Sequence, residues 1–379
     1  MMTKNIALTG RIDSTNSAQW EKDISEAIGD EMPDSIVLDA EKLEYISSAG
    51  LRVLLRLAKK YKNVQVINAQ PDVYEIFDMT GFIEILKVQK ALRKISIEGC
   101  KELGRGTHGT VYRIAPDTIV KVYNKWVTME EIKRERELSR KAFVKGVPTA
   151  IPYDIVMVGD QYGAVFELIN AEPSSEYVNR GQKELDDFIT KSVALIKQIH
   201  SIQMKPGELP DMKVKALACA EEIKGYFTEE TYGKLIKAIN DVPASLNMLH
   251  ADTHLKNFMI CDGEPMLIDM DTICTGDPIF ELATLFNSYK GLPEIDPNAA
   301  AFLGISVETA SYIWDKSLKL YLGTEDQKIL EETTYKVQPL GWVRIIYYMN
   351  RHVDDFPPAK HIIECGCQKI TKLFYNMGK

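Results

Sequence analysis

One stretch of the chain, MLHADTHLKNFMICDGEPMLIDMDT, places carboxylates, histidines and an amide beside two short apolar runs. His250, Asp252 and Asn257 form the pattern HxDxxxxN. Asp269 and Asp271 form a DxD at the end of the run MLID. Phosphoryl transfer needs this combination, because one group orients or deprotonates the incoming hydroxyl while hard oxygen ligands hold Mg²⁺ on the phosphates. We therefore expect Asp252 to accept or orient the hydroxyl. Asn257 and Asp269 are expected to bind Mg²⁺, with support from Asp271.

The histidine of this stretch and its hairpin turn have simpler explanations. His250 is expected to order the loop by hydrogen bonding rather than to titrate in the reaction. The dipeptide DG at 262 and 263 is typical of a hairpin turn, so the stretch could be an ordinary hairpin with polar turns. That interpretation does not explain carboxylates both before the hairpin and after its second strand, and we favour the phosphotransfer site.

A glycine-rich segment lies upstream, in ELGRGTHGTVYRI, where Gly104, Gly106 and Gly109 have GxGxxG spacing. A dinucleotide-binding loop would lead from a strand into a helix, whereas the following residues continue in apolar alternation and predict a β-hairpin. A glycine-rich turn between two strands lets backbone N–H groups approach phosphate oxygens. Val111 would then cover the adenine, and Lys121 would reach the phosphates.

A charged helix is predicted over MEEIKRERELSRKAF, and it offers a partner for the lysine. Glu135 is the preferred candidate to hold Lys121 as an ion pair. Glu131 and Glu137 are near competitors. The plain alternative is an exposed helix with supporting pairs between residues four apart.

The run YGAVFELINAE predicts a strand that ends in a polar connector. Backbone groups of Glu167 and Ile169 are candidates to hydrogen-bond adenine there. A simple buried strand is equally consistent with these side chains.

The segment GWVRIIYYMNRHVDDF carries the candidate acceptor pocket. Its aromatic and acidic side chains could hold a cation by ring faces and carboxylates. These residues are Trp342, Tyr347, Tyr348, Asp354 and Asp355. The alternative, which we favour, is a core helix with a polar end, because aromatic residues at helical spacing usually pack inward.

Composition narrows the class of protein. The chain has 379 residues, 45% of them hydrophobic and 26% charged, as in globular proteins of two or three domains. The net charge of −8 argues against binding to nucleic acid or anionic lipid. Without a secretion signal or a run of ~18 apolar residues, we expect a cytoplasmic protein and no membrane partner. The six cysteines are scattered and expected to be reduced thiols rather than zinc ligands or disulfides.

Two domains are expected. Residues 1–95 alternate strands and helices, with a last strand expected over IEILKV, and predict an α/β domain with a mixed sheet. Residues 96–379 begin with several strands and continue mainly as helices after residue 180, which predicts an α+β domain. Its strand-rich lobe would cover about residues 96–170 and its helical lobe about 171–379.

The first domain resembles the STAS domain of sulphate transporters and anti-sigma-factor antagonists. LTGRID, IVLDAEKLEYISSAGLRVLLRL and IFDMTGFIEILKV carry the resemblance. It implies a compact domain that docks onto a protein partner, in the antagonists under control of a phosphorylated serine. Here Ala49 occupies that serine position and Ser47 stands where the antagonists carry aspartate. We expect Ser47 and Ser48 to cap the helix rather than to form a regulatory phosphosite.

The second domain resembles the aminoglycoside phosphotransferase and choline kinase-like family. GRGTHGTVY, IVKVY, FELI, LHADTHLKN and LIDMDT carry the resemblance, over about residues 96–379. It implies a two-lobed protein-kinase-like fold, ATP with Mg²⁺, and an aminoglycoside, choline, sugar or homoserine-like acceptor. Protein kinases insert a long activation segment after the metal-binding aspartate and place an arginine before the catalytic one. Here Asp271 is followed closely by Gly276, and Ala251 precedes Asp252.

The leading hypothesis is thus an ATP- and Mg²⁺-dependent kinase that phosphorylates a hydroxyl of a small molecule and carries a docking domain. A protein kinase directed to its target by the STAS-like domain is one alternative. A non-catalytic nucleotide-binding scaffold is the other.

Overall fold

The computed structural model describes residues 2–29, 32–106 and 108–376. The chain forms two compact units. The first extends to Glu98 and also includes Ile155–Tyr162, and the second comprises the remaining described residues. Across the described part of the chain, no helix combines the length and the apolar character needed to cross a membrane. The six cysteines are free thiols.

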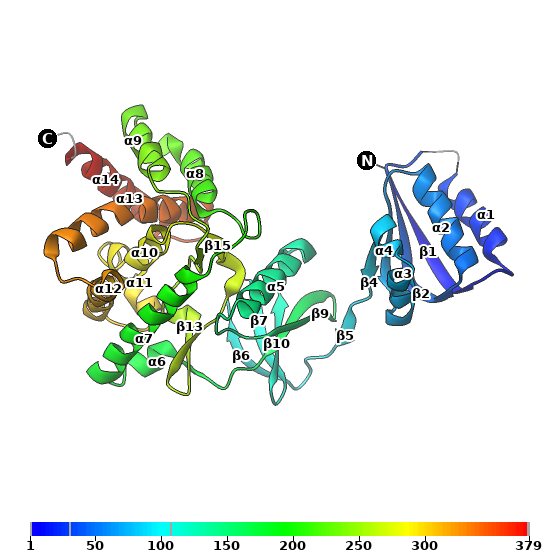
Figure 1. Ribbon diagram of the computed structural model, residues 1–379, viewed down its shortest axis with the longest axis horizontal. Coiled ribbons are helices and arrows are strands. Elements are labelled where there is room, and N and C mark those ends of the chain that lie inside the picture. Colours follow the sequence, from blue (N-terminus) through cyan, green and yellow to red (C-terminus); the bar gives the residue numbers. More distant parts are fainter. Residues whose placement is uncertain (1, 30–31, 107, 377–379) are drawn as a thin grey trace. The chain divides into compact units, whose positions relative to one another are not determined.

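The first unit is built on a four-stranded sheet of order β1-β2-β3-β4, in which every neighbouring pair is parallel. Helices alternate with these strands along the chain, as the blue end of Figure 1 shows. The elements are β1 (Thr3–Ile12), α1 (Ser17–Ile28), β2 (Ser35–Ile46), α2 (Ser48–Lys60), β3 (Val64–Ala69), α3 (Pro71–Met79), α4 (Phe82–Ile85) and β4 (Lys87–Lys90). The expected alternation is confirmed, with a parallel rather than a mixed sheet.

Helix α2 shows why this unit packs closely. Its buried residues recur at three- and four-residue intervals from Gly50 to Leu57, which gives one apolar face toward the core. A Cβ on Gly50 would lie 2.7 Å from Ile46 Cγ1, so a side chain there would push helix and strand apart. Ser47 is the N-cap, and its Oγ accepts from the N–H of Ala49 (3.2 Å). The expected capping role is confirmed for Ser47.

The end of this unit differs from the expectation of one strand over IEILKV. Residues Phe82–Ile85 form the short helix α4, and the last strand begins only at Lys87. Gly81 adopts the left-handed conformation (φ 72°), which lets the chain turn into the extra helical turn. Phe82 then packs against Phe77, with ring centroids 6.4 Å apart. Burial of aromatic surface outweighs the β propensity of the isoleucines.

A six-stranded sheet of order β5-β9-β10-β8-β7-β6 follows. Its central strands β7, β8 and β10 pair in antiparallel fashion. The glycine segment therefore lies between two strands, and the expected hairpin is confirmed. The strands are β5 (Arg93–Ile95), β6 (Lys101–Arg105), β7 (Gly109–Ala115), β8 (Thr118–Tyr123), β9 (Pro152–Val158) and β10 (Gln161–Glu167). Helix α5 (Met129–Val144) is inserted between β8 and β9.

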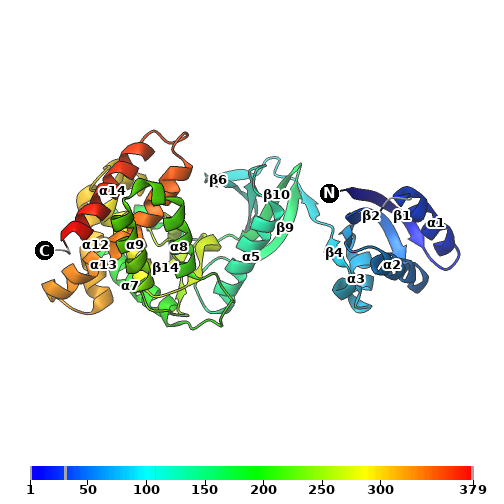
Figure 2. The same ribbon diagram turned by 90° about the horizontal axis from the view of Figure 1, so that it is seen from above.

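The rest of the second unit is mainly helical, as expected, and runs from green to red in Figure 2. Its helices are α6 (Ser174–Val178), α7 (Gln182–Ser201), α8 (Met212–Glu222), α9 (Glu229–Asn240), α10 (Ile279–Phe286), α11 (Asn298–Phe302), α12 (Val307–Leu322), α13 (Gln327–Arg351) and α14 (Ala359–Asn376). Short helical turns occur at η1 (Lys224–Tyr226), η2 (Leu255–Asn257), η3 (Met270–Thr272) and η4 (Asn287–Gly291).

Two small sheets interrupt these helices. One has the order β11-β13-β14, and the other pairs β12 with β15. Their strands are β11 (Glu172–Pro173), β12 (Met248–Leu249), β13 (Phe258–Cys261), β14 (Glu264–Leu267) and β15 (Cys274–Thr275). The acidic stretch of the sequence is thus held between short strands on both sides.

Helix α13 forms part of the core of this unit. It contains Pro339, which cannot donate a backbone hydrogen bond. Asn287 donates from Nδ2 to the Gly341 carbonyl (2.8 Å), and a Cβ on Gly341 would lie 2.5 Å from Asn287 Oδ1. Trp342 is fully buried and packs edge-on against Phe286. The core-helix interpretation of this segment therefore holds for Trp342.

Candidate active site

The lysine of strand β8 forms a short ion pair with helix α5. Lys121 Nζ lies 2.6 Å from Glu135 Oε1 and 3.9 Å from Asp269 Oδ1. Burial lowers the pKa of Lys121, but the carboxylates of Glu135 and Asp269 outweigh it, so the net shift is upward. The ammonium is therefore charged at neutral pH and held in a fixed direction.

Helix α5 presents Glu135 because its other acidic residues are engaged elsewhere. Thr128 and Glu131 form a capping box at its start, each side chain bonding the backbone of the other. Glu137 forms a two-point contact with Arg140, both distances being 3.0 Å. Of the three candidates, only Glu135 turns toward Lys121.

The loop before Asp252 is held in an unusual backbone conformation. Ala251 has φ 64°, a region that costs an alanine about 1 kcal/mol. Its N–H donates to Glu281 Oε2 (2.8 Å), and Thr253 Oγ1 donates to Glu281 Oε1 (2.7 Å). Thr272 Oγ1 donates to the His250 carbonyl (2.7 Å), which ties the loop to the DxD segment.

Glu281 on helix α10 is a buried carboxylate that supports this loop. Burial would raise its pKa, but the neighbouring His200 and the Ala251 N–H lower it to about 2. It is therefore ionised and accepts two hydrogen bonds from the loop. His250 is also buried, and its Nε2 lies 3.3 Å from the Ile268 carbonyl oxygen. Both residues lie where they order the loop rather than at its surface.

Asp252 is surrounded by donors. Asn257 Nδ2 lies 3.0 Å from Oδ2, and Arg344 Nη2 lies 2.9 Å from Oδ1. His254 Nε2 lies 3.5 Å from Oδ2. Burial would raise the pKa of Asp252, but His254 and Arg344 hold it below its usual value. The carboxylate is therefore ionised throughout the physiological pH range.

Two of these supporting residues were not predicted from the sequence. Arg344 of α13 donates to both the Asp252 carboxylate and the Ala251 carbonyl. It is the one charged residue in the run GWVRIIYYM, and a lone charge in an apolar helix is the signal that could have found it. Glu281, within the apolar run IFELATLF, gives the same signal.

The two carboxylates of the DxD lie among other negative charges. Burial is the largest cause of the raised pKa of Asp271. Asp269 and Glu135 raise it further, Lys121 opposes them, and the resulting pKa is about 7. The Asp271 side chain is partly open to solvent, although protein atoms surround most of it. The nearby carboxylates support a raised pKa for this group. One lysine does not balance the negative charge of this cluster.

The residues present fit a Mg²⁺ ion. Asn257 uses its Nδ2 on Asp252, which leaves its amide oxygen available as a ligand. Asp269 and Asp271 would add carboxylate oxygens. Within the described ranges, no group of three or more His, Cys, Asp or Glu side chains could hold a metal by itself. Magnesium at nucleotide sites is typically bound by one or two carboxylates together with phosphate oxygens, so such a set is suitable only with a nucleotide bound.

The glycines of this turn differ in how closely their neighbours approach. A Cβ on Gly109 would lie 2.2 Å from a backbone carbonyl of β8, so only glycine fits at this close strand pairing. Gly104 and Gly106 have no atom within 4 Å of the position where a Cβ would stand. Val111 of β7 pairs with Lys121 of β8, so the strand that follows the glycine turn runs beside the lysine.

The expected adenine-binding segment lies on the other side of β8, because Ala164 of β10 pairs with Lys121. The Glu167 N–H already donates to the Ile151 carbonyl (3.0 Å), which leaves its own carbonyl as the group that could face a base. The Ile169 N–H makes no hydrogen bond within the described part of the chain. Ile169 therefore offers the open donor of this segment.

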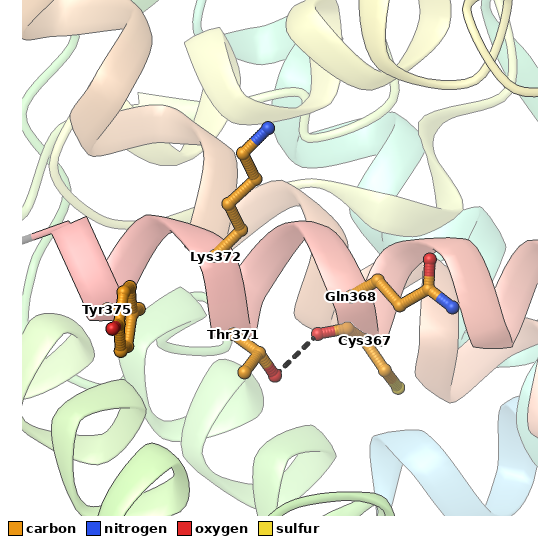
Figure 3. Close-up of a pocket in the computed structure, with 5 residues that line it drawn as sticks. All are labelled: Cys367, Gln368, Thr371, Lys372 and Tyr375. Atoms are coloured by element: carbon orange, nitrogen blue, oxygen red, sulfur yellow. Dashed lines mark hydrogen bonds between the residues drawn. The ribbon is translucent and has the colours of Figure 1, made fainter.

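The aromatic and acidic residues of the candidate cation pocket do not come together. Trp342 lies in the core, whereas Tyr348 is 49% exposed. Asp354 and Asp355 are exposed in the turn after α13. Figure 3 shows a shallow hollow on α14, and none of the predicted site residues lines it. It is lined by Cys367, Gln368, Thr371, Lys372 and Tyr375.

The raised pKa of Asp271 predicts a pH-dependent stability. Between pH 4 and 7 the folded protein binds more protons at this carboxyl than the unfolded chain, so stability without metal falls as the pH rises through this window. After allowance for solvent screening, this fall in the free energy of unfolding is about 1 kcal/mol, and we expect Asp271→Asn to abolish it. Urea unfolding at pH 5 and pH 8 in EDTA measures it.

Asp315→Asn is the matched control, since Asp315 is an exposed aspartate on α12. It should keep the wild-type dependence on pH. Equal pH dependence in wild type and Asp271→Asn would contradict the electrostatic account of the DxD.

Comparison with known proteins agrees with this geometry. Residues 99–311 match the phosphotransferase enzyme family (APH), and residues 3–95 match the STAS domain. The first unit is 39% identical over 85 residues to BtrV of Bordetella bronchiseptica, which carries the name anti-sigma factor antagonist. That match covers 21% of this chain and 72% of BtrV.

Among solved structures, the chain is similar to ADP-bound aminoglycoside phosphotransferase APH(2'')-Ib, with 17% identity, a TM-score of 0.48, and coverage of 70% of this chain and 91% of the other. The complex of APH(2'')-IIa with gentamicin gives 17% identity, a TM-score of 0.47, and coverage of 72% and 90%. These likenesses do not bear on the acceptor.

The APH match spans more than half of the chain, and the expected fold class is confirmed as an α/β STAS domain followed by an α+β APH fold. The chain belongs to the phosphotransferase enzyme family and carries a STAS domain at its N-terminal end.

Proposed function

We propose that the protein is an ATP- and Mg²⁺-dependent kinase that phosphorylates a hydroxyl of a small molecule. The observation that supports it most is the convergence of Lys121, Glu135, Asp269 and Asp271 beside an ionised Asp252. A surplus of carboxylates around one fixed ammonium is unfavourable alone but favourable around a metal-bound polyphosphate. Family membership agrees with this chemistry.

In the proposed reaction, Lys121 contacts the phosphates and the glycine turn covers them. Asn257, Asp269 and Asp271 would hold Mg²⁺, which neutralises charge on the β- and γ-phosphates. The acceptor oxygen forms a bond to the γ-phosphorus while the bond to the bridging oxygen breaks, and its electron pair leaves with ADP. The hydroxyl proton passes toward Asp252.

The lowered pKa of Asp252 defines its role further. A carboxylate held by Arg344 and His254 is a weak base, so it orients the hydroxyl and receives the proton late in the transfer. His250 and Glu281 hold the loop without touching the reacting atoms. Gly104, Gly106, Gly109 and Val111 would surround the nucleotide, with Glu167 and Ile169 at the adenine.

A small acceptor is favoured over a protein because the segment after the DxD is short. The turn η3 ends at Thr272, and the chain enters β15 at Cys274. No long activation segment separates them, so no loop phosphorylation is needed to complete the site. The second candidate, a protein kinase directed by its STAS domain, is supported by that domain alone.

We propose a corresponding division of roles, with residues 1–95 docking a protein partner and residues 96–379 transferring the phosphoryl group. Ala49 cannot accept a phosphoryl group, and Ser47 is engaged as a helix cap. The docking would therefore not depend on a phosphoserine at the usual position. No partner among nucleic acids is expected.

Asp252→Ala should abolish transfer, with a loss in kcat of at least about 10³-fold, while the affinity for ATP changes less than about threefold. The reason is that Asp252 aligns the acceptor and not the nucleotide. Turnover over a panel of hydroxyl compounds and fluorescence titration with an ATP analogue measure the two quantities. Asp241→Ala, an exposed aspartate at the end of α9, is the control. Unchanged turnover in Asp252→Ala would remove the assignment of the orienting residue.

Removal of the STAS domain should leave the rate of transfer to a small molecule within about twofold of the rate of the full-length protein. The truncated chain should begin at Ala91, because β5 (Arg93–Ile95) pairs with β9 and its loss would expose a strand edge. A shorter chain that begins at Ser96 separates loss of the domain from loss of β5. Loss of activity in the chain that begins at Ala91 would show that the first domain is part of the site.

A further inference from the structure

Resting on the proposed function, we propose that the acceptor of this kinase carries an anionic group, a carboxylate or a phosphate, close to the hydroxyl that is phosphorylated. Arg344 and Lys215 would bind that group. The acceptor class is therefore a hydroxy acid or a phosphorylated alcohol rather than a cationic compound.

Arg344 connects the acceptor side of the site to Asp252. It donates to Asp252 Oδ1 (2.9 Å) and to the Ala251 carbonyl from different nitrogens. A guanidinium has five N–H donors in one plane, so donors remain after these two contacts. The side chain is 28% exposed, which leaves part of this plane open to an incoming group. An acceptor anion bound here would lie beside the aspartate that orients its hydroxyl.

Lys215 adds a second cation to the same region. It lies on α8 and is exposed, and its ammonium makes no ion pair or hydrogen bond with any of the described residues. Lys215 and Arg344 both line a small hollow between α8, α10 and α13. Apolar side chains form most of the other walls, among them Met212, Phe280 and Leu340. The hollow itself has a volume of only about 30 Å³, so an anionic group would bind to the two cations at its mouth rather than inside it.

Both signs of charge occur around this hollow. Burial and Glu222 raise the pKa of the Cys219 thiol there, whereas Lys215, Arg344 and Arg351 lower it. Arg351 already contacts Tyr347 and Glu222. Lys215 and Arg344 therefore remain as the cations that a ligand could use.

A cationic acceptor lacks a matching set of groups. The ring of Trp342, which could have held a cation, is buried in the core, and the carboxylates Asp354 and Asp355 are exposed in a turn. The Asp252 carboxylate is already paired with Arg344. The guanidinium beside it weakens the attraction that this carboxylate would offer an amine.

Matched pairs of acceptors test the proposal. Each pair shares one hydroxyl and differs in charge: glycolate with glycolamide, 3-hydroxybutyrate with 3-hydroxybutyramide, and glycerol 3-phosphate with glycerol. Choline and kanamycin represent cationic acceptors. Full-length wild type is compared with Arg344→Met, Lys215→Met and Lys215→Arg, and ADP formation gives kcat and KM for each compound. Lys372→Met on α14 is the surface control, and thermal unfolding reports on folding.

We expect the anionic member of at least one pair to exceed its neutral counterpart in kcat/KM by about 10-fold or more. Lys215→Met should lower kcat/KM by about 10- to 100-fold through a higher KM, because it loses one charge-assisted contact. Its kcat should stay within about twofold of the wild type. Lys215→Arg should recover most of the loss. Arg344→Met should lower both kcat/KM and kcat, because it also releases Asp252, and its kcat should depend more steeply on pH below neutrality.

Preference for neutral or cationic acceptors would overturn the proposal and leave the kinase function intact. A preference for the anion that survives both Met variants would overturn the roles of Arg344 and Lys215. Transfer to no compound of the panel, in samples that bind Mg²⁺ and ATP and hydrolyse ATP slowly, would also overturn the acceptor class. Failure to bind or hydrolyse ATP at all would instead contradict the proposed function.

Discussion

The crowding of carboxylates around Lys121 is the constraint on which the rest of the second unit depends. Glu135 fixes the ammonium from α5, and Asp269 approaches it from the loop after β14. Asp271 and Asp252 add negative charge that one lysine cannot neutralise. Repulsion between these carboxylates is unfavourable in a partly buried site. A divalent ion bound with a nucleotide would offset this negative charge.

The loops that carry Asp252 and Asp269 are held in strained backbone conformations rather than in a continuous helix or strand. Ala251 and Asp269 both adopt positive φ, of 64° and 62°. Ala251 precedes Asp252, and Asp269 is itself a proposed metal ligand. Glu281 stabilises the first of them by accepting the Ala251 N–H, although it touches none of the reacting atoms. A buried ion thus serves to hold a loop that the chain would not otherwise adopt.

Much of this organisation could be predicted from the sequence. Spacing alone predicted that GxGxxG lies in a hairpin, because the residues after it alternate like a strand. Local rules also predicted the capping role of Ser47. The alternation of strands and helices in the first unit was predicted, but its sheet was expected to be mixed and is parallel. Its last strand was placed too early, since the packing of Phe82 on Phe77 is a tertiary contact. Arg344 was missed because it is about ninety residues from Asp252 in the chain. Only the folding of α13 onto the loop brings them together.

The most direct test of the central claim is the dependence of nucleotide binding on Mg²⁺. Calorimetric titration of a non-hydrolysable ATP analogue should give an affinity at least about tenfold higher with Mg²⁺ than in EDTA. Asp269→Asn should reduce this difference severalfold, because Asp269 would supply one of the carboxylates that hold the metal. Equal affinity with and without Mg²⁺ in the wild type, or no binding at all, would contradict the account of the carboxylate cluster as a metal and nucleotide site.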